Sequence, residues 1–276
     1  MEQEQIQQFI DWLQDADLLM VHTGAGMSKD SGVPTYRDAS EGEWGKVSGE
    51  REGSIFDIMN PAYMEANPVY MWQRFARRME QFRDLTPHQG YFILMDWIKR
   101  FNLDYFFITS NIDGQHIKAG ATVDKVREVH GSIFHIQCTV PCHQGFWEAG
   151  ESEEFDYEND DLTRDDLPVC PKCGKMSRPN VYMFRDNTYV PERSKWQKEN
   201  LKKTLAAHSK VLILEIGSGP HVQTIRTMTR QIIREKNARL IRINPDYPEV
   251  KERHMGIAAG ALATLSEVHR EVEKMF

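Results

Sequence analysis

Apolar residues recur at helical spacing near the start of the chain and then form a short unbroken run. Residues 3–15 carry an apolar side chain every three or four positions, which predicts an amphipathic helix. The residues that set this spacing are Ile6, Phe9, Ile10 and Leu13. Residues 18–21 are apolar without a break, as expected of a buried strand. The chain therefore begins with a helix and then a strand.

The two patterns alternate along the rest of the chain. Helical spacing predicts helices over residues 61–83 and 87–101, and their first turns fit the cap and first-turn pairs Asn60-Pro61 and Thr86-Pro87. Strands are predicted over residues 104–109, 178–186, 211–216 and 239–243. Alternating strands and helices form a parallel sheet with helices on both faces and right-handed crossovers. The predicted fold class is α/β.

Composition and charge narrow the class of protein. With 276 residues, 40% of them hydrophobic, the chain can form one large domain and a small module. The 41 acidic residues outnumber the 34 basic ones, so nucleic acid and anionic membranes are not expected partners. No apolar run approaches the roughly 20 residues that span a bilayer. We expect a soluble, cytoplasmic protein, and a lysine-bearing protein tail is a compatible partner.

A glycine-rich stretch follows the first strand. Gly24 and Gly26 allow a tight turn and a close approach of the backbone to a ligand. Ser28, Ser31 and free backbone amides could bind phosphate oxygens there, although an ordinary strand-to-helix turn has the same pattern. Three residues that follow favour a loop folded over a ligand: Gly32, Pro34 and Arg37.

Polar residues also follow the strand over residues 104–109, at the sheet edge where parallel sheets bind ligands. Asn111 and Asp113 could bond a ribose hydroxyl and a carboxamide, or form a simple turn. Further along, His130 stands before Gly-Ser at a strand end. A lone histidine is usually structural, but its ordinary pKa near 6.5 suits it to accept a proton at neutral pH.

All four cysteines fall in two close pairs. Cys138 and Cys142 form the first, and Cys170 and Cys173 the second. Thiolates at these spacings converge on a tetrahedral Zn²⁺, and four protein ligands leave no open position for catalysis. We therefore predict structural zinc, with four free thiols as the alternative. The acidic insert between the pairs, residues 148–166, is expected to be a solvated loop, with substrate docking as the alternative.

The stretch GAGMSKDSGVPTYR, residues 24–37, resembles the signature of the sirtuins, the NAD-dependent protein deacylases. Further sirtuin-like motifs follow in order: SNID, EVHGS, the cysteine pairs, RPNVYMFRD, GSG and INP. Several residues depart from the family pattern. Val33 replaces isoleucine, Tyr36 phenylalanine, Ser110 glutamine, Gln115 leucine and, on the substrate-pairing segment, Arg185 glycine. The resemblance covers about residues 10–270.

This resemblance implies a Rossmann-like doubly wound parallel sheet with a smaller zinc-binding and helical module. The NAD-binding domain would comprise residues 1–37, 86–135 and 180–276, and the small domain residues 38–85 and 136–179. His130 would be the general base, with Asn111 as a second catalytic residue. The implied NAD contacts are Gly24, Ala25, Gly26, Ser28, Tyr36, Arg37, Ser110, Asn111, Ile112, Asp113, Gly217, Ser218, Gly219, Asn244, Pro245 and Ala261.

The implied reaction transfers the acyl group of an acyl-lysine protein or peptide to NAD and yields nicotinamide and O-acyl-ADP-ribose. Three alternatives stay open. The same fold could perform ADP-ribosyl transfer or NAD hydrolysis if Arg185 closes the peptide groove. A dehydrogenase lacks support, because the third glycine of G-x-G-x-x-G and an acidic ribose ligand are missing. A non-catalytic NAD sensor would not need His130. The acyl preference and oligomeric state are not specified.

Overall fold

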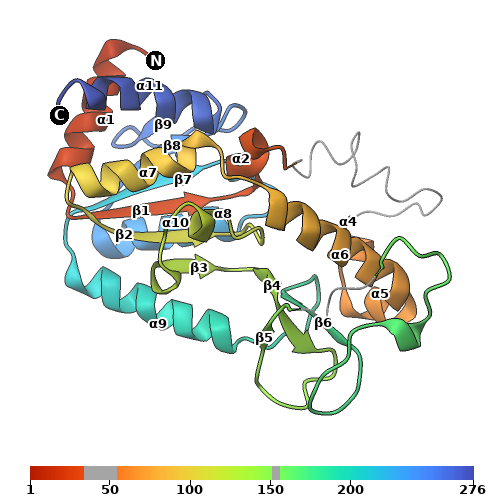
Figure 1. The fold of residues 1–276 in the computed structure, drawn as a ribbon. Coiled ribbons are helices and arrows are strands. Elements are labelled where there is room, and N and C mark those ends of the chain that lie inside the picture. The colour runs from red at the N-terminus through yellow and green to blue at the C-terminus, as the bar shows by residue number, and fades with distance from the viewer. Residues whose placement is uncertain (34–54, 151–155) are drawn as a thin grey trace.

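The computed structural model describes residues 1–33, 55–150 and 156–276. Its centre is a six-stranded sheet in the order β3-β2-β1-β7-β8-β9, with every neighbouring pair parallel (Figure 1). The strands are β1 Leu18–Thr23, β2 Asp104–Thr109, β3 Val126–Glu128, β7 Val211–Ile216, β8 Arg239–Ile243 and β9 Met255–Ile257. The order reverses between β1 and β7. Ligands bind at such a switch point, beyond the carboxyl ends of the strands.

Helices cover both faces of this sheet, because alternate side chains of each strand point to opposite sides. Leu19 and Val21 of β1 pack with the helices α1 Gln3–Asp15, α7 Gln89–Arg100 and α11 Ala261–Glu273. Leu18 and Met20 face the other core, which includes residues of α9 Glu192–Ala207 and α10 Thr224–Lys236. The predicted α/β sheet with helices on both faces is confirmed.

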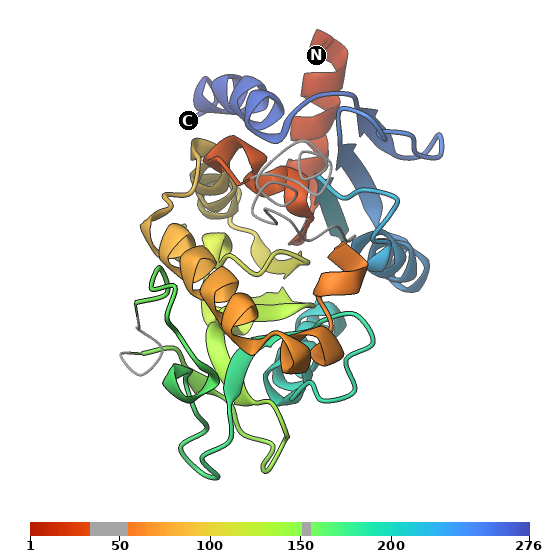
Figure 2. The ribbon, with the colours of Figure 1, turned by 90° about the vertical axis from the view of Figure 1, so that its right-hand side faces the viewer.

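A second, smaller core lies at the end of the sheet where β1 is followed by α2 (Figures 1 and 2). It contains α4 Ile55–Ile58, α5 Pro61–Ala66, α6 Pro68–Asp84 and an antiparallel sheet in the order β5-β4-β6. These strands are β4 Gly131–Cys138, β5 Trp147–Glu148 and β6 Ser177–Val181. Trp72 and Phe75 of α6 pack with Ile133 and Ile136 of β4. Strand β4 crosses the expected domain boundary after residue 135, and the division into domains stays a proposal.

Short helical turns complete the described elements. They are α2 Ala25–Ser28, η1 Lys29–Ser31, α8 Gln115–Lys118, η3 Val123–Lys125 and η5 Arg164–Asp166. In the ranges that the structure covers, no helix combines the length and the apolar character needed to cross a membrane.

Three predicted elements differ from the structure. The helix over residues 61–83 is interrupted at Asn67, because Pro68 disfavours a helical residue before it and begins a new helix. Helix α7 begins at Gln89, and its cap is His88, whose Nδ1 accepts the Gly90 N–H at 3.0 Å; Thr86 is not the cap. The strand over residues 178–186 ends at Val181.

Candidate active site at the carboxyl edge of the sheet

The loops that follow β1 and β7 interlock through their backbones. Gly24 N–H donates to Ile216 O at 3.0 Å, and Gly26 N–H donates to Gly217 O at 3.1 Å. A Cβ atom on Gly26 would lie 2.7 Å from the Cα of Gly217, which itself has a φ of 67°. The sequence predicted that Gly24 and Gly26 allow close approach to a ligand. The structure shows that they allow close approach of the two loops to each other.

Ser28 is a buried link between these loops and the one after β2. It is 1% exposed, and its hydroxyl donates to Asp113 Oδ2 at 2.6 Å. Its oxygen accepts from Asn111 Nδ2 at 2.9 Å, and it lies 2.9 Å from the Tyr91 hydroxyl, which therefore donates to it. Ser28 thus holds the polar side chains after β2 in place, and its hydroxyl is hydrogen-bonded within the protein. Ser31 Oγ likewise accepts the His88 N–H at 3.0 Å.

The segment from Ser110 to Asp113 connects the large sheet to the small module. Asn111 Nδ2 also donates to Gly24 O at 3.1 Å, so both amide protons of Asn111 are used within the protein. Asp113 is 4% exposed, and its Oδ1 accepts the Gln115 N–H at 3.1 Å. Burial raises the pKa of Asp113, and the hydrogen bond from Ser28 opposes that rise. Ile112 packs against the second core.

His130 lies between β3 and β4, at the junction of the two sheets. Its Nδ1 is 3.1 Å from the Ser110 carbonyl oxygen. A carbonyl oxygen only accepts, so in the neutral ring Nδ1 carries the proton and Nε2 is an acceptor. The Thr224 hydroxyl at the start of α10 therefore donates to Nε2, in a long hydrogen bond of 3.5 Å. Burial lowers the pKa of His130, and the Ser110 bond partly opposes this, so the ring is a neutral base at pH 7.

Helix α9 holds the strand that leads to His130. Glu128, the last residue of β3, is buried and forms an ion pair with Arg193. Gln197 Oε1 accepts the Glu128 backbone N–H at 3.1 Å. Arg193 and Gln197 were not singled out in the sequence, and neither was Thr224. Arg193 and Gln197 share one face of α9 with Leu201 and Thr204, which are also buried. This helical spacing is the signal that could have identified them.

The remaining predicted cofactor residues lie at the ends of β7 and β8 and the start of α11. Ser218 is 2% exposed, and Asn244 Nδ2 donates to its carbonyl oxygen at 2.9 Å. Asn244 Oδ1 accepts the backbone N–H groups of Asp246 and Tyr247. Pro245 is exposed at this edge, and Ala261 is buried. Gly219 borders open space, since a Cβ atom there would meet nothing within 4 Å. Tyr36 and Arg37 lie outside the described residues.

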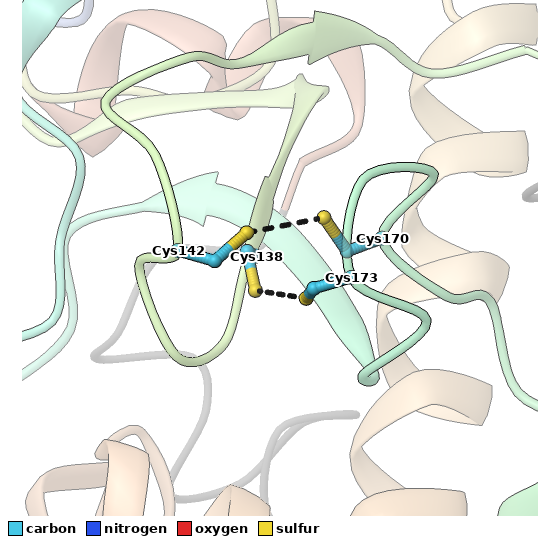
Figure 3. Close-up of side chains that lie close together, drawn as sticks. All are labelled: Cys138, Cys142, Cys170 and Cys173. Atoms are coloured by element: carbon cyan, nitrogen blue, oxygen red, sulfur yellow. Dashed lines mark hydrogen bonds between the residues drawn. The ribbon is translucent and has the colours of Figure 1, made fainter.

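The four cysteines converge at one point, although two are on β4 and its extension and two on a later loop (Figure 3). Their sulfur atoms all lie within 4.8 Å of one another. Cys138 and Cys173 sulfurs are 3.6 Å apart, and Cys142 and Cys170 sulfurs 3.8 Å apart. These separations are too long for disulfides and match the roughly 3.8 Å that a tetrahedral zinc with about 2.3 Å bonds requires. The cluster fits a structural zinc ion.

His143 lies beside the cluster. Gly145 N–H donates to its Nδ1 at 2.8 Å, so the neutral ring carries its proton on Nε2. Nε2 is 3.7 Å from the Cys170 sulfur, close enough for a weak N–H···S hydrogen bond. Such a donor beside a metal-bound thiolate supports the ligand without joining the coordination shell.

Comparison with known proteins identifies the family. A model of the Sir2 family matches residues 24–224. An NAD-dependent protein deacylase of Leptospira interrogans is 32% identical over 81% of this chain and 80% of its own length. An NAD-dependent protein deacylase of Thermus thermophilus is 28% identical over 91% of this chain and 88% of its own length. The structure of a Sir2 homologue in complex with NAD matches with a TM-score of 0.76 at 24% identity, covering 98% of this chain and 94% of that one. The chain therefore belongs to the Sir2 family.

Proposed function

We propose that this protein is an NAD-dependent protein-lysine deacylase that transfers the acyl group of a modified lysine to NAD. Its family and the names of its relatives support an NAD-dependent deacylase. The observation that carries the proposed mechanism is the orientation of His130, whose Nε2 is left unprotonated by the Nδ1 contact with Ser110. One water molecule is consumed, and the products are nicotinamide, free lysine and O-acyl-ADP-ribose.

The carboxyl edge of the sheet fits a dinucleotide. The loops after β1 and β7 meet at the switch point of the strand order, where dinucleotides bind in folds of this type. Beside Gly219 the space is open, since a Cβ atom there would meet nothing within 4 Å. When bound, NAD supplies the ribose carbon that the acyl oxygen attacks as nicotinamide departs. The chain needs no nucleophilic side chain of its own.

His130 acts as the base in this proposal. Its Nε2 takes the proton of a ribose hydroxyl, and the Ser110 carbonyl stabilises the protonated ring through Nδ1–H. Asn111 donates both amide protons to Gly24 and Ser28, so it offers a ligand only its carbonyl oxygen. That oxygen accepts a hydrogen bond from a ribose hydroxyl and orients it.

The substrate peptide binds along the segment that continues from β6, residues 182–186, where an extended peptide can add as a strand. The outer edge of β6 itself is used within the protein, because Ser177 N–H donates to Pro168 O and Ser177 O accepts from Trp72 Nε1. The segment 182–186 is fixed beside the base, because Tyr182 N–H donates to His130 O at 2.9 Å. An acyl-lysine inserted from this segment therefore reaches the His130 region.

Mass spectrometry of products tests the function. The purified protein is incubated with NAD and a panel of acyl-lysine peptides, and we expect deacylated peptide, nicotinamide and O-acyl-ADP-ribose in equal amounts. Peptide or protein carrying ADP-ribose, or free ADP-ribose without deacylation, would instead support a transferase or an NAD hydrolase.

The structural role of zinc and the cytoplasmic location stay predictions, as does the absence of nucleic-acid and membrane partners.

A further inference from the structure

A buried carboxylate lies beneath the β7 loop and has no part in the chemistry proposed above. Glu215 is the fifth residue of β7 and is 0% exposed. Its Oε1 accepts from Arg242 Nε of β8 at 2.6 Å and from the Ser218 hydroxyl at 2.7 Å. One anion therefore contacts both a neighbouring strand and the loop that follows its own strand.

The charge of Glu215 is maintained in this interior. Burial favours the neutral acid, but the charge of Arg242 and the hydrogen bonds to the carboxylate outweigh it and lower the pKa of Glu215. Arg226 Nε of α10 lies 3.8 Å from the same Oε1. A buried charge without such partners would be strongly unfavourable, so removing any member leaves the others uncompensated.

Arg226 extends this network back to the loop. Its Nε and Nη2 donate to the Ser218 carbonyl oxygen at 3.2 and 3.0 Å, and Nη2 also donates to Tyr247 O at 2.9 Å. Asn244 Nδ2 donates to the same Ser218 oxygen. Ser218 is thus fixed at its hydroxyl by Glu215 and at its carbonyl by Arg226 and Asn244.

The fixed residue stands between two glycines that the site uses. Gly217 packs against Gly26 of the β1 loop, and Gly219 borders open space at the edge of the sheet. Arg226 is also two residues after Thr224, whose hydroxyl faces His130 Nε2. The network therefore sets the backbone on the cofactor side of the site and the first turn of α10.

We propose that Glu215 is a positioning residue for dinucleotide binding, which holds Ser218 inward and so shapes residues 217–219 to receive NAD. This inference rests on the proposed function. Variants of this network that still fold should bind the cofactor more weakly and keep their kcat, because the contacts of Glu215 lead to the loop and not to the reacting atoms.

The test measures the Kd of ADP-ribose by calorimetry, the KM for NAD, kcat and the thermal midpoint for wild type and three variants. Glu215→Gln keeps the shape and removes the charge, and Ser218→Ala removes only the contact between loop and carboxylate. Asp186→Asn is the matched control, because Asp186 forms a buried ion pair at 2.7 Å with Arg178 of β6, a strand outside the sheet that contains β7.

We expect Glu215→Gln to raise the Kd of ADP-ribose and the KM for NAD at least tenfold, with kcat at saturating NAD within threefold. Ser218→Ala should raise the Kd of ADP-ribose several-fold. If Glu215→Gln does not fold, the Kd of Ser218→Ala alone tests the inference. Asp186→Asn should lower the thermal midpoint with the Kd within twofold. The inference is overturned if Ser218→Ala and any folded Glu215→Gln bind like wild type, or if Asp186→Asn loses as much affinity. Failure of wild type to bind ADP-ribose would overturn the proposed function as well.

Discussion

His130 Nδ1 and the Ser110 carbonyl oxygen, 3.1 Å apart, come from the ends of the adjacent strands β3 and β2. The parallel pairing of these strands brings the ring and the carbonyl together, so the tautomer of the proposed base is set by sheet geometry. This relationship fixes which nitrogen can take a proton. It also makes the backbone of Ser110 more important than its side chain, which is the position where the family pattern has glutamine.

The first prediction concerns pH. Because burial lowers the pKa of His130, deacylation kcat/KM should be level above neutral pH and fall in acid with a midpoint below 6.5. His130→Ala should lose turnover and keep its NAD affinity within a few fold. A midpoint above 6.5 in a pH-rate profile would contradict the assignment, and a parallel loss of NAD binding would move His130 to the cofactor site.

A second prediction compares two glycines at the same edge. Gly26→Ala places a Cβ atom 2.7 Å from Gly217 Cα, whereas Gly219→Ala meets nothing within 4 Å. Overpacking against rigid backbone should cost Gly26→Ala about 1–3 kcal/mol in the free energy of unfolding. The free energy of unfolding of Gly219→Ala should lie within about 0.5 kcal/mol of the wild-type value. Equal urea midpoints for the two variants would show that the loops are not in close contact.

The third prediction concerns the metal. Cys170→Ala removes one of four converging sulfurs, and apparent zinc binding contributes about 10–16 kcal/mol in small peptide sites. The variant should lose stoichiometric zinc, measured by atomic emission, and melt at a lower temperature. His143→Ala should keep one zinc per chain but release it faster to a chelator, because its N–H···S contact is lost. If wild-type protein purified without a chelator contained no stoichiometric zinc, the proposed site would be contradicted.

Two buried histidines should make the fold sensitive to acid. Burial lowers the pKa of His22 to about 4 and that of His116 to about 3. Below pH 6.5 the unfolded chain binds protons that the folded protein cannot, so stability falls as pH decreases. The loss approaches about 1.4 kcal/mol per pH unit for each histidine. Urea unfolding between pH 7 and pH 5 should show this fall in the free energy of unfolding, and His116→Gln should make it less steep. An equally steep fall in His116→Gln would contradict the lowered pKa of His116.

Arg185 carries the last prediction. It is exposed, and its φ of 55° lies in the left-handed region that favours glycine, the residue of the sirtuin motif at this position. Arg185→Gly should therefore stabilise the fold by roughly 0.5–1 kcal/mol in thermal unfolding. Asn237→Gly, at another left-handed residue on the far end of α10, is the matched control and should leave activity unchanged.

The activity of Arg185→Gly separates three accounts of this cation. Faster removal of acetyl groups would indicate that Arg185 obstructs the peptide. Loss of activity on succinyl-lysine or glutaryl-lysine alone would indicate selection of acidic acyl groups through a charge-assisted hydrogen bond worth about 1.5–3 kcal/mol. We expect little change, because the side chain is exposed. Equal loss on acetyl and succinyl substrates would reject all three accounts.

Much of the fold follows from local patterns. The strands over residues 104–109, 211–216 and 239–243 match the structure, because each contains a short apolar run that is buried in the sheet. The cysteine pairs indicated convergence because metal-site spacing is short and specific. Local patterns failed where backbone geometry decides, as at Asn67, where a proline divides one apolar stripe into two helices.

Contacts between distant segments could not be predicted. Glu215 sits in a run of apolar residues, and its partners Arg242 and Arg226 lie on a different strand and a helix, so no local spacing reveals the network. Ser28 illustrates a different limit. A serine after a glycine turn indicates an anion site, but here its hydroxyl is committed to Asp113, and only the tertiary fold determines which partner it takes.

The central position of β1 has a consequence for synthesis of the chain. Every residue of β1 is buried, and one of its edges pairs with β7, whose first residue, Val211, is opposite Leu18. Until residues 211–216 leave the ribosome, that apolar edge has no partner in the sheet. Such an unpaired strand can associate with other chains, so nascent or truncated forms that end before β7 should aggregate and depend on chaperones.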